Sequence, residues 1–142
     1  MKKVYLFLIT LLIGVVVNAQ DIKTLTEQAE NGDADAMYRI GDLYYYGEGV
    51  TQNYAKAMEW YLKAAEKGNG GAMNDIGWLY QNGQGVTQNY AKAMEWYLKA
   101  AENGDATAMN NIGDLYKDGE GVTQDYAKAM EWYLKAAENG NA

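Results

Sequence analysis

Three residue types with reactive side chains are missing from this sequence: its 142 residues include no cysteine, no histidine and no serine. These absences exclude a thiol nucleophile, a serine-based catalytic triad and an imidazole general base. They also remove the usual protein ligands of zinc, iron–sulfur and haem centres. We therefore expect no enzymatic activity, no metal site and no cofactor.

The first 19 residues have the pattern of a secretory signal peptide. Lys2 and Lys3 precede an apolar run over residues 4–17. Val17 and Ala19 then supply the small residues at positions −3 and −1 of a cleavage site. The run is shorter than the ~20 residues that cross a bilayer as a helix, which favours a signal peptide over a membrane anchor. We expect cleavage after Ala19, no stable membrane span afterwards, and a periplasmic or secreted bacterial protein.

The predicted mature chain is acidic. Loss of Lys2 and Lys3 leaves 10 basic residues against 19 acidic ones, so the net charge changes from −7 to −9. A surface of this sign repels phosphate backbones and anionic lipids. We therefore expect neither nucleic acid nor an anionic membrane as a partner.

An internal repeat is the dominant pattern in the sequence. A glycine recurs every 36 residues, at Gly32, Gly68, Gly104 and Gly140. Cutting the chain at these glycines gives units 32–67, 68–103 and 104–139, with 140–142 as the start of a truncated fourth unit. Of the 36 columns, 25 are identical in all three units, which composition alone cannot produce.

Each unit is predicted to form two helices. In the second helix of the first unit the apolar residues recur with helical spacing, at Tyr54, Ala57, Met58, Tyr61, Leu62 and Ala65. The first helix is expected from about Asp33 to Tyr46. Its midpoint is a glycine in every unit (Gly41, Gly77 and Gly113), although glycine costs a helix about 1 kcal/mol relative to alanine. We interpret these glycines as points where the paired helix approaches closely.

The two ends of the array are expected to differ. Residues 20–31 resemble half a unit and should form a capping helix over the first repeat. The last helix, predicted over residues 125–138, keeps the same apolar residues as its counterparts, without polar replacements. We therefore expect it to expose apolar surface, which indicates self-association or a missing continuation of the array.

The repeated columns resemble a known family. The second unit combines Ala72, Ile76-Gly77, Tyr80, Gly83-x-Gly85, Lys92-Ala93, Trp96 and Ala100-Ala101. This pattern is similar to the Sel1-like repeat, a relative of the tetratricopeptide repeat, and the resemblance covers residues 32–139. It implies an all-α solenoid of stacked antiparallel helix pairs in a right-handed superhelix, with the first helices on the concave side. It also implies an adaptor that binds proteins.

The columns that differ between units are the candidate binding surface. Nine of the eleven differing columns lie in the first seventeen positions of the unit. Differences at positions 35, 38, 42, 45 and 46 of the first unit form one stripe along a helix, opposite the apolar face. The candidate partner-binding residues are Asp35, Tyr38, Asp42, Tyr45, Tyr46, Asn74, Trp78, Gln81, Asn82, Asn110, Asp114, Lys117 and Asp118. Tyrosine and tryptophan offer large contact area at low entropic cost, which favours binding over neutral drift of solvent-facing positions.

Three functions are compatible with this surface. The first is an exported adaptor that binds a protein or peptide in the groove. The second is a binder of cell-wall glycan or peptidoglycan fragments that stacks sugars on the aromatic side chains. The third, a β-lactam-binding or hydrolysing enzyme of the kind reported for some secreted members of the family, is disfavoured. Those members carry a disulfide in each repeat, and this chain has neither cysteine nor the usual nucleophiles.

Overall fold

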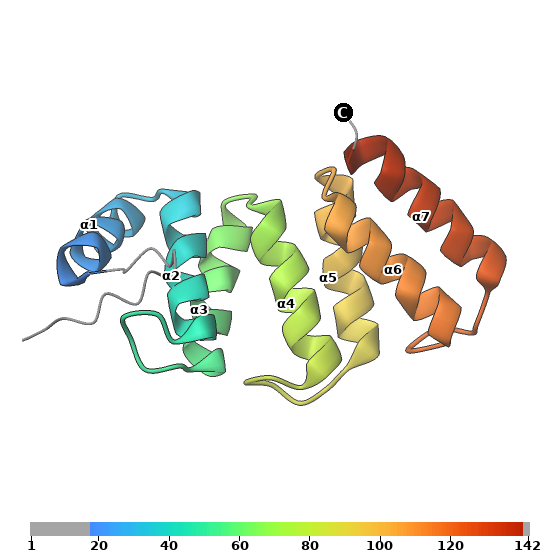
Figure 1. Cartoon of the computed structure of the whole chain (residues 1–142), viewed down its shortest axis with the longest axis horizontal. Coiled ribbons are helices and arrows are strands. Elements are labelled where there is room, and N and C mark those ends of the chain that lie inside the picture. The colour runs from blue at the N-terminus through green and yellow to red at the C-terminus, as the bar shows by residue number, and fades with distance from the viewer. Residues whose placement is uncertain (1–17, 141–142) are drawn as a thin grey trace, which may run out of the picture.

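The computed structural model describes residues 18–140, in which the only regular elements are seven α-helices. They follow one another along the long axis of the molecule (Figure 1). In chain order they are α1 (Ala19–Glu30), α2 (Ala34–Tyr46), α3 (Tyr54–Glu66), α4 (Gly70–Asn82), α5 (Tyr90–Glu102), α6 (Ala106–Asp118) and α7 (Tyr126–Gly140). The predicted all-α solenoid of helix pairs is therefore confirmed. All but the last two residues of the predicted signal peptide (1–19), and residues 141–142, lie outside the described residues.

Side-chain caps and left-handed glycines define the helical hairpins. The first helices α2, α4 and α6 are capped by Asp33, Asn69 and Asp105, whose side chains accept a hydrogen bond from a backbone N–H of the first turn. Each of these helices ends at a glycine with positive φ, which a residue with a Cβ rarely adopts. For Gly83 φ is 62°. The chain then turns through a short loop into the second helix of the unit.

The mid-helix glycines are the points of closest helix approach, as predicted. A Cβ added at Gly77 would lie 2.6 Å from Cδ1 and Cε1 of Tyr97, a side chain on α5 that is fully buried. Gly41 faces Tyr61, and Gly113 faces Tyr133, in the same way. The ring of each tyrosine therefore occupies the space that glycine leaves open, and this contact fixes the distance between the two helices of a unit.

The two ends differ in how their apolar surface is covered. Helix α1 packs on α2 and buries Leu25 and Ala29, so it covers the end of the first unit. Its N-cap in the structure is Asn18. At the other end Met130 of α7 is 58% exposed, whereas the equivalent Met58 and Met94 are buried under the following unit. The expected exposure of apolar surface is thus observed, and self-association through α7 stays a prediction.

Candidate functional site

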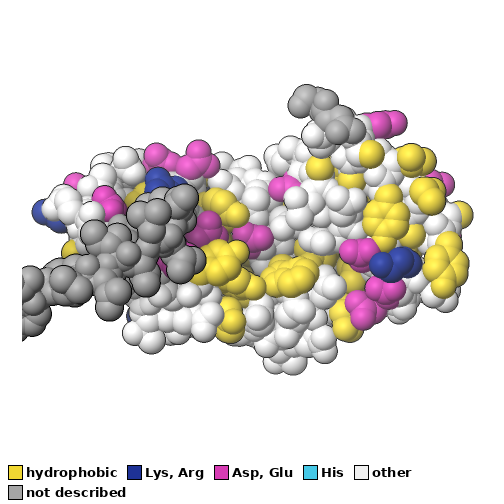
Figure 2. All heavy atoms as spheres, in the orientation of Figure 1, with side chains coloured by type: hydrophobic (Ala, Val, Ile, Leu, Met, Phe, Trp, Pro, Cys, Tyr) yellow, Lys and Arg dark blue, Asp and Glu magenta, His cyan; other side chains and the backbone are white. Residues whose placement is uncertain are grey.

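A cavity opens where the first helices of the three units come together. Its volume is about 300 Å³. It is lined by Tyr45, Tyr46, Tyr61, Asn74, Asp75, Trp78, Thr107 and Asn111. Figure 2 shows hydrophobic and acidic side chains gathered on this face over α2 and α4, with no Lys or Arg among them. The cavity therefore joins side chains from three consecutive repeats into one recess.

The rim of the cavity is aromatic. Tyr45 and Tyr46 from the end of α2 meet edge to face, with ring centroids 4.8 Å apart. Trp78 of α4 faces them, because its indole Nε1–H donates to the Tyr45 hydroxyl at 3.1 Å. Tyr46 is 64% and Trp78 is 41% exposed, so both present apolar ring surface to a ligand. The structure thus brings these three predicted residues together.

The floor of the cavity is a polar chain that crosses all three units. The Tyr38 hydroxyl of α2 donates to Asp75 Oδ2 at 2.9 Å, and Asn74 Nδ2 donates to Asp75 Oδ1 at 3.1 Å. Asn111 Nδ2 of α6 donates in turn to Asn74 Oδ1 at 2.9 Å. These hydrogen bonds hold Asp75 in one orientation and connect it to both neighbouring repeats. Asn74 is buried, so the floor is part of the folded scaffold as well as of the cavity.

Asp75 carries the unusual electrostatics of the site. Burial raises the pKa of its carboxyl group to about 6; the hydrogen bond from Tyr38 opposes the increase, and the charge of Asp42 adds to it. Burial and the charge of Asp75 also raise the pKa of Tyr38. Among residues 18–140 no Lys or Arg forms an ion pair with Asp75. A partly buried carboxylate without a cationic partner is costly, and such groups concentrate at functional sites.

Other residues of the predicted stripe accept hydrogen bonds from tyrosine hydroxyls of the second helices. The Tyr61 hydroxyl donates to Asp42 Oδ1 at 2.8 Å, and Tyr133 donates to the equivalent Asp114. The second unit has Trp78 in that column, and there the Tyr97 hydroxyl donates to Gln81 Oε1 at 2.6 Å. These acceptors pair with the hydroxyls of the tyrosines that pack against the mid-helix glycines, so their first role is structural.

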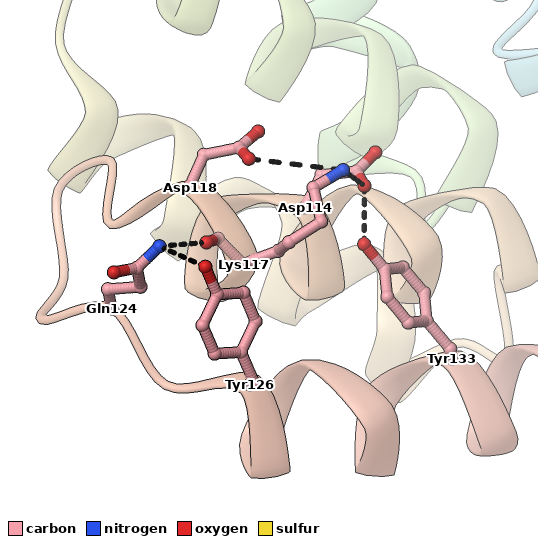
Figure 3. Close-up of polar contacts among 6 residues, drawn as sticks. All are labelled: Asp114, Lys117, Asp118, Gln124, Tyr126 and Tyr133. Carbon is pink, nitrogen blue, oxygen red and sulfur yellow. Dashed lines mark hydrogen bonds and ion pairs between the residues drawn. The ribbon is translucent and has the colours of Figure 1, made fainter.

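The third unit contributes a separate polar cluster (Figure 3). Lys117 Nζ lies 3.0 Å from Asp114 Oδ1 and 3.9 Å from Asp118 Oδ1. Burial alone would raise the pKa of Asp114, but hydrogen bonds from Tyr133 and Lys117 outweigh it and lower that pKa. Because Lys117 forms ion pairs with these carboxylates, this end of the stripe differs electrostatically from the cavity.

The remaining predicted residues lie outside the cavity. Asp35 accepts a hydrogen bond from Asn69 Nδ2 at 3.0 Å, across the boundary between the first two units. Asn82 Nδ2 donates to the Trp78 carbonyl oxygen at 2.9 Å. Asn110 is exposed on α6. The stripe is thus one surface of the array, of which the part around Tyr45 and Trp78 forms the recess.

Four residues that line the cavity are absent from the predicted binding residues: Tyr61, Asp75, Thr107 and Asn111. Thr107 lies in the column of Asp35, which belongs to the stripe. Asp75 and Asn111 occupy the column of Arg39, which differs in all three units and lies next to the stripe position of Tyr38. That difference is the sequence signal that identifies the column. Tyr61 belongs to an invariant column and packs in the core, so no difference between units distinguishes it.

A second cavity of about 540 Å³ lies between α1 and α2. It is lined by Asp21, Thr24, Leu25, Gln28, Arg39, Asp42, Leu43 and Glu48. Its polar lining carries both signs of charge and no aromatic side chain. Over the described range 18–140, no cluster of acidic residues is arranged to hold a metal ion. Within the same range no helix combines the length and apolarity needed to cross a membrane.

The stacked hairpins and the recess along their first helices define an α-solenoid of the class that displays a binding surface on repeated helices. The Sel1 repeat model matches residues 34–69, 71–105 and 106–141 of this sequence. The chain belongs to the Sel1 repeat family. Proteins of this family generally mediate protein–protein interaction and are generally non-catalytic scaffolds.

Two solved structures show the same fold at substantial identity. A Sel1 repeat protein from Oxalobacter formigenes is 39% identical, with a TM-score of 0.80, over 86% of this chain and 50% of that one. The protective antigen c5321 of uropathogenic Escherichia coli is 44% identical, with a TM-score of 0.81, over 86% of this chain and 26% of that one. This chain therefore matches half or less of each of these proteins.

Curated relatives match over one repeat-sized segment. The ERAD-associated E3 ubiquitin-protein ligase components HRD3A and HRD3B of Arabidopsis thaliana are 46% and 44% identical over 46 residues, or 32% of this chain. The match covers 7% and 8% of those proteins. The shared segment is long enough to include one helical hairpin, so the likeness concerns the repeat.

Proposed function

We propose that this protein is a non-catalytic adaptor that binds a peptide segment of a partner protein in the cavity between α2, α4 and α6. The observation that carries the proposal is the aromatic rim of the cavity, in which Trp78 contacts Tyr45 of the preceding repeat and Tyr46 and Trp78 are exposed. An isolated exposed aromatic residue needs no explanation, but aromatic side chains gathered at a recess are typical of binding sites. Family membership supports the same function, because Sel1 repeats generally bind proteins.

The shape of the site also favours an extended ligand. The lining residues come from the three successive first helices α2, α4 and α6 and from α3, so a bound segment would contact more than one repeat. Hydrogen-bonding groups of Asn74, Thr107 and Asn111 line the same cavity and can pair with a peptide backbone.

A glycan or peptidoglycan fragment is the second candidate ligand. The observation that favours it is the exposed ring surface of Tyr46 and Trp78, since sugars stack on aromatic faces. The partly buried carboxylate of Asp75, which can pair with a charged group of a peptide, and a lining drawn from three repeats favour a peptide. Binding to a glycan array together with no selection of peptides would establish the second candidate in place of the first.

The double variant Tyr45→Ala Trp78→Ala tests the cavity directly. Random peptides displayed on phage are selected on the wild-type protein, and their affinity for both proteins is measured by fluorescence anisotropy. We expect at least a tenfold loss of affinity, because truncation of a central aromatic contact costs about 2 kcal/mol or more. Circular dichroism should show that helicity is kept, since Trp78 is exposed and Tyr45 is only partly buried at the edge of the core.

Tyr126→Ala is the matched control for this variant. Tyr126 is 67% exposed at the start of α7 and lies outside the cavity, so its removal should change affinity less than twofold. Equal loss of affinity in the control and the double variant would contradict the proposed site. Failure of any peptide to bind the wild-type protein would contradict peptide binding itself.

We further propose that the protein is exported. The basic start, the apolar run over residues 4–17 and the small residues before Gln20 support this. Cleavage after Ala19 removes Asn18, which caps α1 in the full chain, and leaves Asp21 as the remaining capping side chain. Protein recovered from the periplasm or medium of an expressing bacterium should begin at Gln20. Recovery of an intact N-terminus from the cytoplasm would contradict export.

A further inference from the structure

The cavity has acidic and aromatic groups but no cation. Asp75 lies on its floor, and Asp42 lies close enough to raise the pKa of Asp75 by its charge. None of the eight lining residues is Lys or Arg, and none of the ion pairs within residues 18–140 includes Asp75. The hydrogen bonds from Tyr38 and Asn74 orient the carboxylate without supplying a positive charge. A negative charge in the cavity is therefore left uncompensated by the protein.

The aromatic rim suits the same kind of ligand. The faces of tyrosine and tryptophan rings attract cations by about 0.5–2 kcal/mol, depending on how far the pair is desolvated. Tyr46 and Trp78 expose ring surface beside the recess whose floor holds Asp75. A cation on an aliphatic stem can place its charge near the carboxylate while the stem covers the rings.

This chain already uses the combination of basic side chain and aromatic ring elsewhere. Lys63 Nζ lies 4.1 Å from the centroid of the Trp60 ring, and Lys99 and Lys135 repeat the contact on Trp96 and Trp132. In these pairs both partners come from one helix. At Trp78 and Tyr46 the rings have no such partner within the described part of the chain, so their faces are available to a cation of a ligand.

We propose that the cavity is a recognition site for a basic side chain, lysine or arginine, of the bound peptide, with Asp75 as the charge partner and Tyr45, Tyr46 and Trp78 as the aromatic walls. This inference rests on the proposed function, because it names the chemistry of the segment that the adaptor binds. The volume of about 300 Å³ is at the lower end of the range of ligand sites, roughly 300–1,000 Å³, and fits one side chain with its backbone. Specificity would come from charge complementarity at this position.

Selection from an unbiased peptide library tests the inference. The peptides selected on wild-type protein should share one lysine or arginine. Replacement of that residue by norleucine or citrulline should weaken binding at least tenfold, which is the scale of losing one partner of a desolvated charge pair. Trimethyllysine should be tolerated if the rings dominate recognition, and lysine should bind better if Asp75 dominates.

Asp75→Asn tests whether the Asp75 carboxylate pairs with the positive charge of the bound peptide. Asparagine occupies the same column in the third unit as Asn111, so the repeat tolerates it. The variant should bind the basic peptide at least tenfold more weakly and the norleucine or citrulline peptide as well as the wild type does. Glu95→Gln, which removes an equal charge from the exposed surface of α5, should leave both affinities within twofold.

The outcomes separate this inference from the proposed function. Selected peptides without a basic residue, whose binding still depends on Trp78, would overturn the charge recognition and leave the adaptor function intact. Equal loss of affinity by Asp75→Asn for basic and neutral peptides would show a structural role for Asp75 and would also overturn the inference. Absence of any binding peptide would overturn the proposed function and this inference together.

Discussion

Replacement of Gly77 by leucine should unfold the central repeat. Any Cβ at this position would lie 2.6 Å from the Tyr97 ring, and the carbonyl oxygen of Ala93 is 3.2 Å away, so neither neighbour can yield without moving α5. Overpacking by a single group costs about 1–3 kcal/mol, and leucine adds four carbon atoms. Because the native state of a domain is stable by only about 5–15 kcal/mol, the central unit should lose its packing altogether.

Thermal unfolding followed by circular dichroism measures this effect. Gly77→Ala should lower the melting temperature by several degrees, whereas Gly77→Leu should remove much of the helical signal and the single cooperative transition. Gly71→Ala is the control on the same helix, since a Cβ there meets its neighbours at 3.4 Å or more. It should be neutral or stabilising by about 0.4–1 kcal/mol, because alanine restricts the unfolded chain. An unchanged melting temperature for Gly77→Leu would refute the close-approach explanation.

The repeat period made most of the fold predictable. The columns that are identical in all three units predicted the repeats, and the spacing of apolar residues predicted the helices. Gly41, Gly77 and Gly113 indicated where the paired helices touch. The identity of the contacting group, the tyrosine ring of the second helix, did not follow from the spacing. It depends on the rotation of one helix about its axis relative to the other, which a one-dimensional pattern does not contain.

The candidate site was only partly predictable for the same reason. A helical stripe groups Tyr45, Tyr46 and Trp78, because they lie on one face of their helices. It does not show that Asp42 and Asp114 turn toward the core tyrosines of their own units. It also misses Asp75, which meets Tyr38 across a repeat boundary. Contacts between units depend on how the hairpins stack, whereas the stripe describes one helix at a time.

Asp75→Asn should stabilise the folded protein at neutral pH. The folded pKa of Asp75 is about 6, above the unfolded value of 3.8, so between these pH values the folded chain binds more protons than the unfolded chain. Stability therefore decreases as pH rises through this window, by up to about 3 kcal/mol in total. Asparagine carries no charge to desolvate, and both of its side-chain groups can still pair with the Tyr38 hydroxyl and the Asn74 amide.

Urea unfolding of the wild type and the variants between about pH 3 and pH 7.5 measures this difference. The wild type and Asp75→Asn should be similar in stability near pH 4, and Asp75→Asn should be more stable by about 3 kcal/mol above pH 6.5.

Asp114→Asn should behave in the opposite way, because hydrogen bonds from Tyr133 and Lys117 lower the pKa of Asp114. That variant should be less stable than the wild type at neutral pH, with the difference shrinking as pH falls below the usual aspartate pKa.

A pH-independent effect of Asp75→Asn would show that the Asp75 carboxylate is not desolvated. A stabilisation confined to neutral pH would mean that the protein keeps a charge in its cavity against its own stability, as a site for a cationic ligand requires.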